Sequence, residues 1–335
     1  MKVLLLFGGN SSENKVSRKS AKSIIQNIDE DIFELTSVYI DYNNKWYLFN
    51  DLINIDNNTW IKENLEIKNI IEFIKQFDIV FPIIHGYSGE DGKLQGMLEL
   101  FSIPFVGCDT IVSANLMDKA FSKIIFEHYN IKQTPYLIIN RKYNYLKITK
   151  NLKFPMIIKP ANGGSSIGIS KANNTKELIK GIKKAFKYDK KIVIEEFIKA
   201  RELECAVLKK NNKLIMNIGE ILNNKEFYDY NAKYINETVT TTNPILNKKV
   251  KKQIKKISKK IFTQLDCKVL ARIDFLYDDD NEILYLNEIN TLPGFTEISM
   301  YPKLLTSNNI TYKNLITSII KSSLNDTTTC QVLTK

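Results

Sequence analysis

Hydrophobic runs alternate with helix-like segments through the first third of the chain. Residues 2–7 form an unbroken hydrophobic run typical of a buried strand, and a helix is expected over 13–28 after a turn of glycine, asparagine and serine. A second buried strand is expected over 79–84, followed by a glycine-rich loop and a short helix. Strands that alternate with helices are typical of a parallel sheet. The pattern therefore predicts an α/β fold whose N-terminal domain, residues 1–108, is doubly wound.

The pattern changes after residue 108. Residues 109–198 are expected to form a small unit of strands and helices, with helices over 115–129 and 175–187 and strands over 136–139, 155–159 and 192–194.

Longer strands are predicted in the last part of the chain. Residues 199–325 are expected to contain strands over 203–209 and 214–221, a polar loop over 223–243, a lysine-rich helix and a hairpin. Residues 326–335 have little hydrophobic content and are expected to form a loose tail. The chain is thus divided into three units and a tail.

The composition of the chain limits its size class, its relation to membranes and its cellular compartment. The chain has 335 residues, 44% of them hydrophobic, which is enough for two to three modest domains. Its hydrophobic runs are shorter than the ~20 residues that span a bilayer, so no membrane association is expected. The cysteines at positions 108, 205, 267 and 330 lack the spacing of a metal site. Reduced thiols and a cytoplasmic location are expected.

The formal net charge of +11 raises the alternative of a nucleic-acid-binding module. Lysines supply most of this charge and are spread along the whole chain. The densest run, residues 248–260, places hydrophobic side chains at helical spacing, as an amphipathic helix with a solvated lysine face does. Because no aromatic side chains interleave with this basic face, no nucleic-acid partner is expected.

Four polar residues near strand ends predict a site for a hard cation. Arg272 and Asp274 end one expected strand, and Glu288 and Asn290 end the next, with a turn over 278–281 between them. Mg²⁺ on nucleotide phosphates is held by one or two carboxylates, so Asp274, Glu288 and Asn290 are candidate ligands.

A glycine- and serine-rich loop follows Lys159. Residues 163–168 read Gly-Gly-Ser-Ser-Ile-Gly, and backbone N–H groups of such a loop can surround phosphate groups. Together with the expected cation site, this loop predicts nucleotide chemistry.

Several short motifs follow one another along the chain: His85-Gly86, Gly89-Glu90-Asp91-Gly92, Gln95-Gly96, Met117-Asp118-Lys119, Phe227-Tyr228-Asp229-Tyr230, Ala232-Lys233-Tyr234 and Asn290-Thr291-Leu292-Pro293-Gly294-Phe295-Thr296. Their order resembles that of the D-alanine–D-alanine ligases of the ATP-grasp superfamily, and the resemblance covers roughly residues 1 to 320. The resemblance implies a three-domain ATP-grasp fold and ATP-dependent joining of two D-alanines through an acyl phosphate, for peptidoglycan precursor synthesis. It also implies two Mg²⁺ ions, with Mn²⁺ as an alternative, and a homodimer.

The resemblance assigns catalytic roles to five residues: Glu13, Ser165, Tyr234, Arg272 and Gly294. Glu13 would pair with the ammonium group of the first D-alanine and accept a hydrogen bond from Ser165. Arg272 and the backbone N–H of Gly294 would stabilise the oxyanion of the tetrahedral intermediate, where preorganised donors contribute most. Tyr234 would lie on a loop that closes over the site and excludes water.

The remaining implied contacts concern ATP and the second substrate. The residues implied to contact ATP are Lys119, Lys159, Ser166, Glu195, Glu196, Phe197, Ile198, Glu202 and Lys233. Lys119 and Lys159 would bind phosphates, and Ser166 belongs to the glycine-rich loop. Lys233 lies on the polar loop that would close over the site. The segment from Glu195 to Ile198 would bind the adenine, and Glu202 would bind the ribose. His85, Ser299 and Met300 would lie at the second substrate. Two positions depart from the family pattern, Asn14 after Glu13 and Ala200 before Arg201-Glu202.

The second substrate leaves an alternative open. Tyr234 in the closing loop is similar to members that form D-alanyl-D-alanine, whereas D-lactate-using members carry a histidine there. The run from Val106 to Thr110 is similar to D-serine-using members of the vancomycin-resistance type. Met300 beside Ser299 would suit a methyl group better than a hydroxymethyl group. D-alanine is therefore expected, with a D-alanine–D-serine ligase as the alternative and a non-catalytic ATP-grasp binding protein as the remote one.

Overall fold

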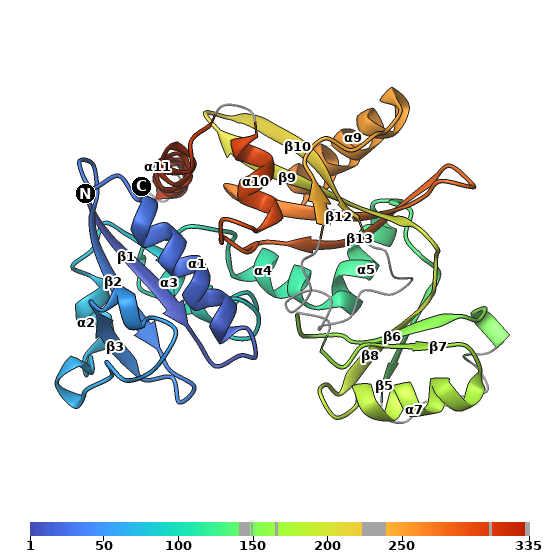
Figure 1. The fold of residues 1–335 in the computed structure, drawn as a ribbon, viewed down its shortest axis with the longest axis horizontal. Helices are drawn as coiled ribbons and strands as arrows, with labels where there is room; N and C mark the ends of the chain where they lie inside the picture. Colours follow the sequence, from blue (N-terminus) through green and yellow to red (C-terminus); the bar gives the residue numbers. More distant parts are fainter. Residues whose placement is uncertain (141–147, 149, 165–166, 223–238, 308–309, 332–335) are drawn as a thin grey trace.

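A computed structural model of the chain describes residues 1–140, 148, 150–164, 167–222, 239–307 and 310–331. The described residues form three sheets, with strand orders β3-β2-β1-β4, β5-β8-β6-β7 and β11-β10-β9-β12-β13. Figure 1 shows the first sheet at the left of the molecule, the second at the lower right and the third above the second, with the helices α4 and α5 in the middle.

The N-terminal sheet is mixed. Strand β1 pairs in parallel with β2 and β4, whereas β2 and β3 are antiparallel. The bounds are β1 Lys2–Gly8, β2 Glu34–Ile40, β3 Trp46–Phe49 and β4 Ile79–Pro82, and helix α1 covers Asn14–Asn27. The alternation of strand and helix predicted for this region is confirmed, while β2 and β3 had not been predicted and the antiparallel β3 edge departs from an all-parallel sheet.

Six short helices follow strand β3, three of them before β4 and three after it. They are η1 Leu52–Asn54, η2 Glu63–Leu65, α2 Ile70–Ile74, α3 Lys93–Leu100, α4 Thr110–Met117 and α5 Lys119–His128. The prediction of a single helix over 115–129 is wrong, because α4 ends before Asp118 and α5 begins after it. The Asp118 carboxylate accepts hydrogen bonds from the backbone N–H groups of Ala120 (2.9 Å) and Phe121 (3.2 Å) and so caps the start of α5.

The central sheet is small and antiparallel. Its strands are β5 Tyr136–Asn140, β6 Met156–Pro160, β7 Ser170–Ala172 and β8 Lys191–Glu196, and helix α7 covers Thr175–Ala185. Leu178 and Ile182 of α7 pack with Ile158 and Ile194 of the sheet in one buried cluster. The glycine-rich loop lies between β6 and β7, as the sequence predicts.

The C-terminal sheet carries the predicted hairpin. Its strands are β9 Arg201–Lys210, β10 Lys213–Leu222, β11 Val239–Thr241, β12 Leu270–Asp278 and β13 Ile283–Asn290, and helix α9 covers Lys248–Gln264. Strand β11 lies inside the polar loop predicted over 223–243 and pairs with β10, so that prediction is wrong for residues 239–241. Helix α9 buries Val250, Ile254 and Ile261, which confirms its predicted amphipathic character.

The last two helices join the N-terminal and C-terminal units. Helix α10 covers Met300–Thr306 and α11 covers Tyr312–Gln331. Leu315 and Ile319 of α11 share one buried cluster with Phe7 of β1 and Leu208 of β9. The tail predicted to be loose over 326–335 is helical as far as Gln331.

The domain boundaries stay a prediction. Cys108, Val112 and Leu116 pack in the same cluster as strands β9 and β12, so α4 shares a core with the C-terminal sheet. Within the part of the chain that the structure describes, no helix is both long and hydrophobic enough to cross a membrane.

Candidate active site

The β12–β13 hairpin brings the predicted cation site together. Antiparallel pairing places Arg272 opposite Asn290 and Asp274 opposite Glu288. Because residues two apart on a strand share a face, these four side chains lie on one side of the sheet. The Asn290 amide nitrogen Nδ2 donates a 2.9 Å hydrogen bond to Asp274 Oδ2. The sequence prediction that these residues converge is therefore confirmed.

Arg272 is held by two carboxylates. Its Nε and Nη2 atoms donate to the two oxygens of Asp274 at 2.8 Å and 2.7 Å, and Nε lies 3.2 Å from Glu204 Oε2 on the neighbouring strand β9. Burial lowers the pKa of Arg272, but Asp274 and Glu204 together raise it well above its usual value. The guanidinium is a fixed, oriented positive charge. Glu204 was not predicted from the sequence.

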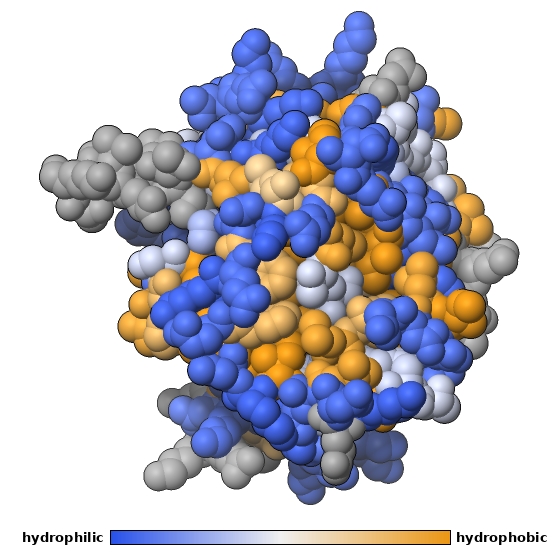
Figure 2. All heavy atoms as spheres, turned by 90° about the vertical axis from the view of Figure 1, so that its left-hand side faces the viewer, coloured by the Kyte–Doolittle hydropathy of each residue, from blue (hydrophilic) through white to orange (hydrophobic). Residues whose placement is uncertain are grey.

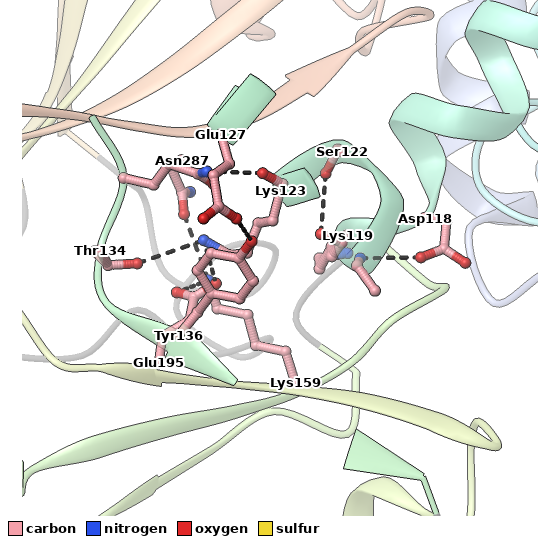
Figure 3. A network of polar contacts seen from close by, with 12 residues as sticks. Asp118, Lys119, Ser122, Lys123, Glu127, Thr134, Tyr136, Lys159, Glu195 and Asn287 are labelled. Atoms are coloured by element: carbon pink, nitrogen blue, oxygen red, sulfur yellow. Dashed lines mark hydrogen bonds and ion pairs between the residues drawn. The ribbon is translucent and has the colours of Figure 1, made fainter. Parts of the chain in front are cut away.

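A second polar cluster, the Glu195 network, lies between helix α5 and the central sheet (Figure 3). The Glu195 carboxylate accepts from Lys159 Nζ at 2.9 Å through Oε2 and pairs with Lys123 Nζ at 3.1 Å through Oε1. Lys159 Nζ also lies 3.4 Å from Asn287 Oδ1 on β13. Burial raises the pKa of Glu195, but Lys123 and Lys159 outweigh it and lower the pKa to about 2. Lys123 was not predicted, since nothing in the sequence separates it from the other lysines.

Lys119 holds the glycine-rich loop in place. Its ammonium group donates a 2.6 Å hydrogen bond to the carbonyl of Gly163, and its backbone N–H donates to the carbonyl of Ala161 at 2.9 Å. Lys119 begins α5, and Lys159 lies one residue before the end of β6, ahead of the same loop. Two predicted phosphate-binding lysines therefore flank one loop.

Glu13 lies where the N-terminal domain meets the glycine-rich loop. A Cβ atom added to Gly86 or to Gly164 would lie 2.4 Å from Glu13 Oε2, so both glycines allow the carboxylate to approach the backbone. The structure thus brings Glu13 next to the loop in which Ser165 is predicted to bind it. Ser165 and Ser166 themselves lie outside the described residues.

Glu90 is a carboxylate of this region to which the sequence had assigned no role. Its Oε2 atom accepts a 2.6 Å hydrogen bond from the backbone N–H of Gly86. Desolvation and the negative charge of Glu13 raise the pKa of Glu90 to about 8. The sequence feature that could have marked Glu90 as a site residue is its position in the Gly-Glu-Asp-Gly motif.

His85 connects two loops. Its Nδ1 atom lies 3.2 Å from the carbonyl of Leu292, which only accepts, so Nδ1 carries the proton; Nε2 then accepts from the Ser20 hydroxyl at 3.0 Å. Burial lowers the pKa of His85, which favours this neutral form. Ser20 Oγ in turn accepts from the backbone N–H of Phe295 at 3.2 Å. Both ring nitrogens bind protein atoms, and His85 positions the segment that contains Gly294.

Ser299 and Met300 have different surroundings. Ser299 Oγ accepts from the backbone N–H of Thr296 at 3.1 Å and lies 3.0 Å from the Cβ position of Gly294. Met300 is 6% exposed and belongs to the hydrophobic core, with its sulfur beside Gly219 of β10. The predicted role of Met300 in a substrate pocket stays a prediction, and its packing favours a structural role.

The predicted adenine segment lies at the end of β8 and beyond it. Glu195 and Glu196 belong to the strand, and only Phe197 and Ile198 lie in the connection to β9. Glu196 Oε1 accepts from the backbone N–H of Lys153 at 2.8 Å. Glu202 on β9 is close enough to Lys159 to raise the pKa of that lysine. The predicted residues Lys233 and Tyr234 lie outside the described residues.

Known proteins match almost the whole chain. The family described as D-ala D-ala ligase N-terminus matches residues 2–108, and the family described as D-ala D-ala ligase C-terminus matches residues 125–321. The D-alanine–D-alanine ligase B of Clostridium tetani is 42% identical, with 97% of this chain and 94% of that protein covered. The D-alanine–D-alanine ligase of Clostridium acetobutylicum is also 42% identical, with 96% and 97% covered.

Solved structures match as well. The VanG D-Ala:D-Ser ligase of Enterococcus faecalis has a TM-score of 0.85 at 32% identity, with 96% of this chain and 99% of that chain covered. The D-alanine–D-alanine ligase of Bacillus anthracis, solved in complex with ATP, has a TM-score of 0.79 at 28% identity, with 98% and 99% covered. The chain belongs to the D-alanine–D-alanine ligase family. The predicted family, ATP-grasp fold and ligase class are confirmed.

Proposed function

We propose that the protein joins two D-alanines to D-alanyl-D-alanine and converts one ATP to ADP and phosphate, as a step in peptidoglycan precursor synthesis. The observation that carries the proposal is the register of β12 and β13, which sets Arg272, Asp274, Glu288 and Asn290 on one face. The curated relatives at about 40% identity, which are named D-alanine–D-alanine ligases, support it.

The first step is phosphoryl transfer. A carboxylate oxygen of the first D-alanine attacks the γ-phosphorus of ATP, the bond to the bridging oxygen breaks, and ADP leaves. Glu13, with its carboxylate between Gly86 and Gly164, is suited to binding the ammonium group of that D-alanine. Lys119 and Lys159 flank the glycine-rich loop and supply positive charge to the phosphates. Positioning and charge neutralisation are what this reaction requires from a protein.

The second step is attack by the amine. The amine nitrogen of the second D-alanine attacks the acyl carbon, loses a proton, and phosphate leaves as the peptide bond forms. Arg272 is a charged donor near the hairpin face, and the backbone N–H of Gly294 is the proposed second donor to the oxyanion. Ser299 lies beside Gly294 and would bind the carboxylate of the second D-alanine. The neighbouring Met300 is buried in the hydrophobic core and begins helix α10.

Asp274, Glu288 and Asn290 would hold Mg²⁺. In the described residues, no group of three or more histidine, cysteine, aspartate or glutamate side chains is arranged to bind a metal by itself. Two carboxylates and one amide oxygen on paired strands nevertheless fit a hard cation whose other ligands are phosphate oxygens and water. When bound, the ion neutralises phosphate charge. Two Mg²⁺ ions, or Mn²⁺ in their place, are part of this proposal.

The other proposed contacts follow the resemblance. Ser166 would contact phosphates, Lys233 and Tyr234 would lie on the loop that closes over the bound ATP, and Glu202 would bind the ribose. The adenine would lie against the segment from Glu195 to Ile198.

D-serine is the second candidate for the second position, because the VanG D-Ala:D-Ser ligase is among the structural matches. The test is product analysis with D-alanine and D-serine competing at equal concentration, with ATP and MgCl₂. D-Alanyl-D-alanine as the main product is the expected result. A product dominated by D-alanyl-D-serine would move the protein to the resistance-type group. Absence of phosphate release with D-alanine would favour the non-catalytic ATP-grasp binding protein, and phosphate release that does not depend on D-alanine would favour a different ATP-grasp enzyme.

A homodimer in the cytoplasm is also proposed. Leu100 and Ile111 lie on the neighbouring helices α3 and α4 and are 78% and 72% exposed. Figure 2 shows hydrophobic side chains gathered in the middle of one face of the molecule, with hydrophilic ones around them. Sedimentation equilibrium tests the dimer, and a monomer at micromolar concentration would contradict it.

A further inference from the structure

Lys123 is the most deeply buried lysine of the Glu195 network (Figure 3). Its side chain is 2% exposed, against 13% for Lys159 on the other oxygen of the same carboxylate. Lys123 Nζ also lies 3.5 Å from Thr134 Oγ1 and 5.0 Å from the centre of the Tyr136 ring. Protein atoms therefore surround Lys123, whereas Lys159 borders the glycine-rich loop.

Two lysines in the first turns of helix α5, Lys119 and Lys123, contact different parts of the protein. Lys119 and Lys123 are four residues apart and lie on the same helix face. The ammonium group of Lys119 reaches the glycine-rich loop at Gly163, and that of Lys123 reaches Glu195 instead. One helix thus fixes both the loop and the carboxylate that holds Lys159.

The Glu195 carboxylate forms ion pairs with two ammonium groups, one on each of its oxygens. Both ammonium groups lie within 3.1 Å of it. A buried carboxylate that loses its only cationic partner is strongly destabilised, so with a single lysine the ion pair would resist any ligand that competes for that lysine. With two lysines, one can leave while the other keeps the carboxylate neutralised.

We propose that Lys123 is a positioning residue for nucleotide binding: it remains on Glu195 as a fixed countercharge and so allows Lys159 to exchange that carboxylate for the phosphates of ATP. The inference rests on the proposed ATP-binding role of Lys159. It assigns to Lys123 an effect on ATP affinity in addition to any effect on folding.

The test is a double-mutant cycle on the full chain, with the dissociation constant of MgATP measured by calorimetry. Lys123→Met keeps the length of the side chain and removes the charge, and Glu195→Gln removes the carboxylate charge that holds Lys159. Lys123→Met alone should weaken MgATP binding by about tenfold or more, the factor that corresponds to ~1.4 kcal/mol. In the Glu195→Gln background the same substitution should change the dissociation constant by less than about twofold.

Two comparisons separate this role from a purely structural one. Adenosine, which has no phosphates, should bind Lys123→Met and wild type about equally well. Lys209→Met, which breaks a 2.9 Å ion pair with Asp326 far from the network, should leave MgATP binding unchanged. Lys123→Gln gives the same readout if the methionine variant does not fold, because it also lacks the charge.

Two results overturn the inference while leaving the proposed function intact. One is a wild type and a folded Lys123→Met variant that bind MgATP equally well. The other is a loss of the same size in the wild-type and Glu195→Gln backgrounds. A wild type that does not bind MgATP would instead refute the proposed function.

Discussion

Replacing Glu195 with glutamine removes the negative charge that two buried lysines share. The side chain keeps its size, but the ammonium groups of Lys123 and Lys159, at 3.1 Å and 2.9 Å, lose their common partner. Because all three side chains are largely withdrawn from water, solvent compensates little for the loss. We expect the Glu195→Gln variant to be markedly less stable than the wild type at neutral pH.

The size of the effect follows from the pKa of Glu195. The folded protein lowers that pKa from 4.5 to about 2. At ~1.36 kcal/mol per pKa unit, this difference corresponds to ~3 kcal/mol of folding free energy. Since the pKa is lower in the folded state than in the unfolded state, this contribution is fully present above pH 4.5 and is lost as the pH falls toward about 2.

The assay is urea denaturation followed by far-UV circular dichroism. Wild type should exceed Glu195→Gln by ~3 kcal/mol at pH 7.5, and the difference should narrow to ~2 kcal/mol near pH 3.5. Glu72→Gln is the matched control, because Glu72 pairs with Lys75 at 3.1 Å on an exposed helix face. That substitution should cost about 0.5 kcal/mol or less. Equal stability of the wild type and Glu195→Gln at pH 7.5, or a difference that widens in acid, would refute this account of the network.

Three further predictions concern the reaction. Arg272→Lys should lower kcat by about 10²-fold, because an ammonium cannot reproduce the guanidinium fork, and a defect confined to the KM for D-alanine in steady-state assays would contradict the oxyanion role. Glu288→Ala should abolish most phosphate release even at saturating Mg²⁺, and near wild-type release would exclude Glu288 as a ligand. Gly164→Ala should raise the KM for the first D-alanine, because the new Cβ would lie 2.4 Å from Glu13 Oε2 and displace that carboxylate. An unchanged KM would contradict the proposal that Glu13 binds this substrate.

The hairpin could be predicted from the sequence because its information is local. A turn over residues 278–281 between two alternating segments fixes the register, and the register places Asp274 opposite Glu288. The strand and helix order of the first domain is equally local, except for the short strands β2 and β3. The family could be predicted from the order in which the short sequence motifs follow one another along the chain.

The Glu195 network could not be predicted in the same way. Lys123 and Glu195 are far apart in the sequence, and the burial of both depends on how α5 packs against β8. The tautomer of His85 depends likewise on Leu292, more than 200 residues away in the chain. Asp118, which divides one predicted helix into α4 and α5, acts through a capping geometry that hydrophobic periodicity does not reveal.

The most direct test of the proposed reaction follows one oxygen atom. D-Alanine labelled with ¹⁸O in its carboxylate is supplied with ATP and MgCl₂, and the released phosphate and the dipeptide are analysed by mass spectrometry. If a carboxylate oxygen attacks the γ-phosphorus, phosphate formed with each D-alanyl-D-alanine carries one ¹⁸O atom from the first D-alanine. Unlabelled phosphate, or phosphate release without dipeptide, would contradict the acyl phosphate route and with it the proposed function of the site.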